Sequence, residues 1–96
     1  MTFDQFTATL DKPQPPAGLS PLLQALWYDA QGNWEAAHNV AQTREGEKSY
    51  DRIHAYLHRK EGDRFNANYW YRRAGVSFFD GSLEEEWAIL VKQLLA

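Results

Sequence analysis

The sequence predicts a single all-α domain, and three observations support this prediction. All four prolines lie before residue 22, so the rest of the chain can form helices without interruption. Apolar residues then recur at spacings of three and four, in stretches that end at single glycines. Isoleucine and valine are few, and no segment alternates apolar and polar residues for long, so strands are not expected. A chain of 96 residues has room for one such domain.

Residues 1–19 are expected to form an N-terminal arm. The first part of this arm has an apolar face at helical spacing, made by Phe3, Phe6 and Leu10. A proline-rich stretch follows, and it cannot continue a helix. Because Ser20 directly precedes Pro21, the pair predicts an N-cap followed by proline at the first helical position.

The next part of the chain, residues 20–75, predicts four helices joined in pairs by short turns. Their expected ranges are about 21–31, 34–44, 49–61 and 64–74. Gly32 and Gly62 suit the ends of the first and third helices, and Asn33 and Asp63 suit the caps of the helices that follow. Ser49, or the residues just before it, is expected to begin the third helix.

A connection and a last helix are expected in residues 76–96. Ser82 and Glu85 have the spacing of a capping box, which predicts that this helix begins at residue 83. Its apolar stripe consists of Leu83, Trp87, Leu90, Val91 and Leu94. We expect this helix to cover an apolar face that the preceding helices leave open.

An internal repeat relates the two helix pairs. The segment 25–37 aligns with 55–67 at an offset of 30 residues, without a gap. Each copy has a small residue on its first helix, the glycine turn with its polar cap, and a second alanine on the following helix. The small residues are Ala25 and Ala37 in the first copy and Ala55 and Ala67 in the second. The repeating unit is therefore a helical hairpin.

These hairpins resemble the tetratricopeptide-like family. The second copy carries the resemblance best, through Gly62-Asp63, Ala67, Tyr71 and Ala74, while the first keeps Ala25, Tyr28, Gly32-Asn33 and Ala37. The first copy departs from the pattern at Ala41 and Arg44, the closing proline is absent from both, and the family repeat is longer, at about 34 residues.

The resemblance implies stacked hairpins that form grooves for protein segments. Two hairpins are fewer than such arrays need, so it also implies that the arm and the last helix act as caps. Residues 55–75 are similar, in addition, to a group of small bacterial proteins of unassigned function, and that similarity implies no activity.

Composition excludes several classes of function. Without cysteine the chain has no disulfide, thiol nucleophile or cysteine-rich zinc site, which favours a reducing, cytoplasmic setting. The net charge of −3 does not favour binding to nucleic acid. No apolar run is long enough for a helix that spans a membrane, and the first residues do not have the pattern of a secretory signal peptide. No serine elbow or phosphate-binding loop is present, so we assign no catalytic residue.

The helix at 64–74 and the connection after it supply the first candidate site. Aromatic and arginine side chains, which are common at binding hot spots, gather there: Tyr69, Trp70, Arg72, Arg73, Phe78 and Phe79. They predict a non-enzymatic interaction or scaffold module that binds a protein partner or associates with itself. The alternative is that the second apolar side of this helix packs under the last helix or the arm.

The three histidines supply a second candidate site. His54 and His58 are four residues apart and share a helix face, and His38 joins them if the second helix packs on the third. With Asp51 or Glu35, they would form a site for a divalent metal such as zinc, or for a small molecule or proton transfer. The alternative is that His38 and His54 are hydrogen-bonded residues at the edge of the core and that His58 is solvated.

Overall fold

The computed structural model describes all 96 residues and contains six α-helices and no strand, which confirms the all-α prediction. The helices are α1 Phe3–Ala8, α2 Pro21–Ala30, α3 Trp34–Ala41, α4 Lys48–Lys60, α5 Arg64–Ala74 and α6 Leu83–Leu95. Two 3₁₀ turns, Thr9–Asp11 and Gln42–Arg44, extend α1 and α3. None of the helices is long and apolar enough to span a membrane.

The helix starts follow the predicted caps, with one exception. Ser20, Asn33, Asp63 and Ser82 each accept a hydrogen bond from the first turn of the helix that they precede. Helix α4 begins at Lys48, directly before Ser49 as expected, but no side chain caps it. In the repeat, Ala25, Ala37, Ala55 and Ala67 are all fully buried, which allows the helices to approach closely.

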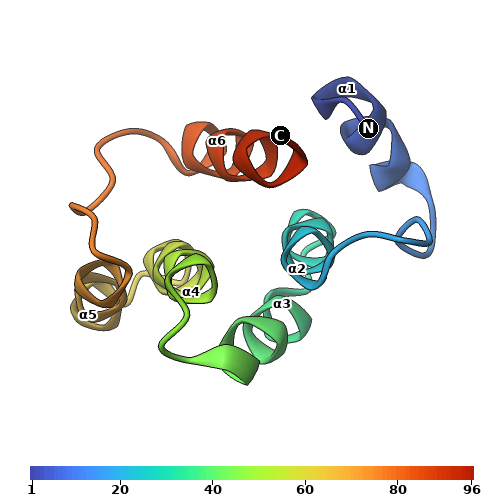
Figure 1. The fold of residues 1–96 in the computed structure, drawn as a ribbon. Coiled ribbons are helices and arrows are strands. Elements are labelled where there is room, and N and C mark those ends of the chain that lie inside the picture. Colours follow the sequence, from blue (N-terminus) through green and yellow to red (C-terminus); the bar gives the residue numbers. More distant parts are fainter.

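Helix α4 lies at the centre of the molecule. It packs extensively on α5, as α2 does on α3, and it also contacts α3 and α6. Figure 1 shows α6 on one side of α2 and α4, with α3 on the other side, and α1 near α2 and α6. The N-terminal arm is thus part of the packed structure, and Phe6 in α1 is completely buried in the main core.

The core is divided into two clusters. The larger one joins α1, α2, α3, α4 and α6 around Trp27, Tyr56 and Leu57. Trp87 of α6 belongs to its edge, and the indole nitrogen of Trp87 donates a hydrogen bond of 3.0 Å to the carbonyl of Leu26. The smaller cluster lies between α4 and α5, where Phe78 and Phe79 of the connection pack against it.

A buried carboxylate connects α6 to α4 and α5. Glu86 has no exposed surface, and its two oxygens lie 2.8 Å from guanidinium nitrogens of Arg52 and Arg59. The hydroxyl of Tyr71 donates a hydrogen bond to the same carboxylate. Burial and this hydrogen bond raise the pKa of Tyr71 above its ordinary value, so Tyr71 remains a donor. A charge this deeply buried is tolerated because it is surrounded by partners.

We expect Glu86→Ala to lower the free energy of unfolding by about 3–5 kcal/mol, because it leaves two arginines around an empty position. Urea denaturation followed by circular dichroism measures this change. Glu84→Ala is the matched control, since Glu84 is exposed and lies two residues before Glu86 on the same helix, and it should cost less than about 1 kcal/mol. Equal losses in the two variants would contradict the role assigned to Glu86.

Candidate metal centre

The three histidines meet at the contact between α3 and α4. His38 lies on α3 one turn after Trp34, and His54 and His58 lie one turn apart on α4. Because α3 packs against α4, one ring nitrogen from each imidazole comes within 4.8 Å of the other two. The cluster therefore joins the first hairpin to the second.

Within the cluster, His38 and His54 are in direct contact. Their Nε2 atoms are 2.9 Å apart, so one ring donates a hydrogen bond to the other. The Nδ1 atom of His54 is buried and has no hydrogen-bond partner. An unsatisfied acceptor is tolerated more readily than an unsatisfied donor, so we place the proton of His54 on Nε2, from which it is donated to His38.

Two tryptophans enclose the imidazoles. The ring of Trp34 stacks on His38 with centroids 4.7 Å apart, and the ring of Trp70 stacks on His54 at 3.9 Å. Trp34 is itself fixed, because its indole nitrogen donates a hydrogen bond of 2.7 Å to the carbonyl of Leu57. These stacks restrict the rotation of the imidazoles and hold them close together.

Burial keeps two of the imidazoles neutral. His54 is only 2% exposed, and its burial, followed by the neighbouring His38 and His58, lowers its pKa to about 3. Burial and the nearby His58 also lower the pKa of His38. Neutral imidazole is the form that binds a metal ion, so both rings are in the binding form at neutral pH.

His58 has a different environment at the rim of the cluster. Its Nδ1 atom contacts the carboxylate of Glu61 at the end of α4, which leaves Nε2 as its free ring nitrogen. Its side chain is 12% exposed, so His58 is half-buried at the rim and only partly in contact with solvent. A carboxylate on the far nitrogen of an imidazole is the usual outer partner of a metal-binding histidine. Glu61 was not proposed for this role, although it stands three residues after His58, a spacing that allows contact on a helix.

The two carboxylates expected at the metal site are elsewhere. Asp51 is buried, but its Oδ1 atom accepts a hydrogen bond from the amide of Gly46 and its Oδ2 atom lies 3.9 Å from Arg73. Glu35 is exposed on α3 and does not belong to the cluster. Both residues were expected there from their sequence spacing to the histidines alone. Spacing does not show that the backbone amide of Gly46, in the loop before α4, binds the Asp51 carboxylate.

The aromatic and arginine residues proposed for partner binding divide into two groups. Trp70 is buried against His54, and Phe78 and Phe79 are half-buried against the smaller core cluster, so these three rings do not form a free surface. Trp70 packs on α4, which corrects its assignment to a partner surface. The alternative that the second apolar side of this helix packs under the last helix or the arm is also wrong, because Tyr69 on that side is 46% exposed. Tyr69, Arg72 and Arg73 remain exposed on α5.

The surface of α5 contains a further residue that was not chosen from the sequence. Phe65 is 85% exposed and lies one turn before Tyr69, which is 46% exposed. The sequence predicts apolar residues on two sides of this helix, but it does not show which of their rings stays exposed.

The cluster favours an ion over an organic substrate. The molecule has three cavities, and no histidine lines any of them. A metal ion needs only converging ligands, whereas a substrate needs a cleft. The arrangement can thus hold an ion between two helices, with the partly exposed sides of His38 and His58 facing solvent.

Comparison with known proteins finds no match: no family model, no curated protein and no solved structure is similar to this chain.

We expect the imidazole of His54 in the metal-free protein to stay neutral well below pH 6.5. Its pKa is lower in the folded chain than in the unfolded chain. At pH values between these two pKa values, the unfolded chain therefore binds more protons than the folded chain. The contribution of His54 to stability is therefore complete above pH 6.5 and is lost as the pH falls toward about 3. NMR measures the pKa of each histidine directly, when the signals of the carbon-bound protons of the three imidazoles are followed against pH in the presence of a chelator. A His54 midpoint near 6.5 would refute the buried, neutral state.

Proposed function

We propose that this protein binds one divalent first-row metal ion, best matched by Zn²⁺, through His38, His54 and His58. The observation that carries the proposal is the convergence of three ring nitrogens, from two different helices, within 4.8 Å. A tetrahedral zinc site with metal–nitrogen bonds of 2.0–2.1 Å needs ligand nitrogens about 3.4 Å apart. The Nε2 atoms of His38 and His54 are 2.9 Å apart, so these two rings would move slightly apart to hold the ion.

The surroundings support zinc in different ways at the three ligands. Glu61 orients His58 as an outer partner, and the tryptophan stacks hold His38 and His54. His54 is the weakest ligand, because binding through Nε2 moves its proton to Nδ1, where no acceptor is present. We therefore expect a site of moderate affinity whose fourth position is filled by water.

A metal at this place would fix the position of one hairpin relative to the other. Its ligands come from α3 and α4, which belong to different copies of the repeat, so a bound ion would connect the two copies. We infer a non-enzymatic role in which the ion stabilises the stacked hairpins as a scaffold. Alanine-lined helix contacts give little apolar area per residue, and an added cross-link would offset that weakness.

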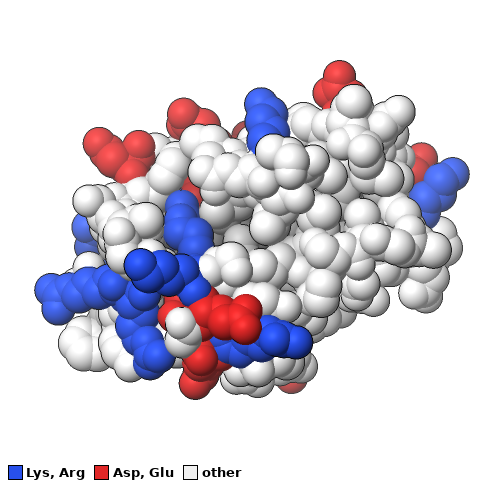
Figure 2. Space-filling model, viewed as in Figure 1, with Lys and Arg blue, Asp and Glu red and all other residues white.

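The exposed stripe on α5 supports a second function, binding to protein. Phe65, Tyr69 and Arg72 have the spacing of one helix face, and an exposed phenylalanine beside a tyrosine and an arginine has the composition of an interface hot spot. Figure 2 shows most of the Lys and Arg side chains of one face gathered near α4 and α5, with acidic groups among them. This mixture of charges favours association between copies of the chain over binding to a uniformly charged partner.

For the metal, we expect the untagged protein to bind about one equivalent of Zn²⁺ in isothermal titration calorimetry, and its melting temperature to rise with zinc and fall back with a chelator. His58→Ala should abolish binding. Glu61→Gln should weaken it roughly tenfold, because the outer partner is impaired while the three ligands remain.

Glu35→Ala is the matched control for the metal experiment, since Glu35 lies on α3 near His38 but outside the cluster. It should bind zinc like the wild-type protein. If Co²⁺ gives the absorption of an octahedral aquo ion, or if His58→Ala binds zinc unchanged, the three-histidine site is wrong.

For the interface, we expect Phe65→Ser to weaken self-association about tenfold in sedimentation equilibrium, because it removes the largest exposed ring. Asn39→Ser, at an exposed position of α3, should have no effect. A wild-type protein that stays monomeric at millimolar concentration would exclude self-association through this face.

A further inference from the structure

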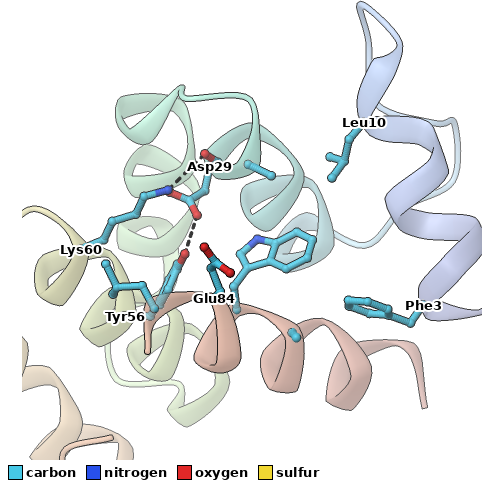
Figure 3. Close-up of a pocket in the computed structure, with 10 residues that line it drawn as sticks. Phe3, Leu10, Asp29, Tyr56, Lys60 and Glu84 are labelled. Carbon is cyan, nitrogen blue, oxygen red and sulfur yellow. Dashed lines mark hydrogen bonds and ion pairs between the residues drawn. The ribbon is translucent and has the colours of Figure 1, made fainter. Parts of the chain in front are cut away.

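The largest cavity lies on the other side of α4 from the histidines. It is open to solvent, has a volume of about 580 Å³ and is lined by the N-terminal arm, the end of α2, the end of α4 and the first turns of α6. Figure 3 shows Phe3 and Leu10 on one side of it and Asp29, Tyr56 and Lys60 on the other. Its size and its mostly apolar walls are those of a site for a small organic molecule.

One end of this cavity is polar and firmly built. The carboxylate of Asp29 is 1% exposed, and it accepts a hydrogen bond of 2.7 Å from the hydroxyl of Tyr56 and one of 2.9 Å from the ammonium group of Lys60. Burial and the neighbouring Asp29 raise the pKa of Tyr56, so its hydroxyl keeps its proton. Asp29 and Lys60 together contribute no net charge to the cavity.

Glu84 adds a negative charge that has no partner in the cavity. It lies in the first turn of α6, and its carboxylate points into the cavity toward Asp29 and Tyr56 (Figure 3). No hydrogen bond or ion pair holds it, whereas the adjacent Glu85 is engaged in the helix cap. The charged side chains that line the cavity are thus Asp29, Lys60 and Glu84, with an excess of one negative charge.

We propose that this cavity binds a small organic cation, with a primary ammonium or guanidinium group on an apolar or aromatic body. The cationic group would pair with Glu84 beside the Asp29 end. The apolar body would lie against the indole of Trp87, which packs edge-to-face with Phe3 at 6.0 Å between ring centroids and is held in place by its hydrogen bond to Leu26. The indole of Trp87 also favours a cationic ligand, because a cation is attracted to the face of an indole ring.

Three probes with the same aromatic ring and different charges test this proposal: phenethylammonium, 2-phenylethanol and 3-phenylpropionate. They are titrated at pH 7 into ¹⁵N-labelled protein, with a chelator present so that the histidine cluster plays no part. We expect phenethylammonium to shift the Trp87 indole and Ala88 amide signals and to bind at least about fivefold more tightly than the carboxylate, with the alcohol in between. Tighter binding of the carboxylate, or no shift with any probe, would overturn the proposal.

Two variants locate the binding. Glu84→Gln should weaken phenethylammonium about fivefold and leave the alcohol unchanged. Glu85→Gln is the matched control, since glutamine also completes a capping box, and it should bind like the wild-type protein. Ala88→Leu should block all three probes by filling the cavity, with its far-ultraviolet circular dichroism unchanged. If Glu84→Gln and Glu85→Gln act alike, or if Ala88→Leu binds normally, the cation site is not in this cavity.

Discussion

The buried carboxylate of Glu86 is the contact on which the packing of the C-terminal helix depends. It is enclosed by two arginines of α4 and by the hydroxyl of Tyr71 from α5, and it has no access to water. Three elements must therefore be in place together, because each partner left alone would be a buried charge or an unpaired polar group. With α6 fixed in this way, Trp87 reaches the carbonyl of Leu26 and the wall of the cavity is complete.

The same central helix serves both candidate sites, through different faces. On α4, the residues that contact α6 or line the cavity are Arg52, Tyr56, Arg59 and Lys60. They are four, three and one residues apart, so they lie on one side of the helix. His54 and His58 lie between them in sequence and point toward α3, where His38 completes the cluster. A helix surrounded by neighbours on most sides can carry two polar groups without mixing them, because its 3.6-residue period separates the faces. The proposed metal site and the proposed cation site therefore lie on different faces of the same helix.

Most of the fold was predictable, because its signals are local. The caps at Ser20, Asn33, Asp63 and Ser82 and the small residues of the repeat act within a few residues of where they stand. The pairing of His54 with His58 was predictable for the same reason. The tetratricopeptide-like relationship is a different kind of prediction, since it rests on a pattern of small residues, and the structure establishes only that helical hairpins are present.

The sequence alone determined which segments become helices, where they begin and end, and which residues share a face, because hydrogen bonds and side-chain spacing within a helix are local properties. Only the tertiary structure decided which polar residues are buried. Glu86 lies in a run of three glutamates that looks like a solvated first turn, and Asp29 looks like an exposed residue at the end of α2, yet both are enclosed by partners 15 or more residues away. The cost of burying a charge depends on what surrounds it in space, and that information appears only when the helices are packed together.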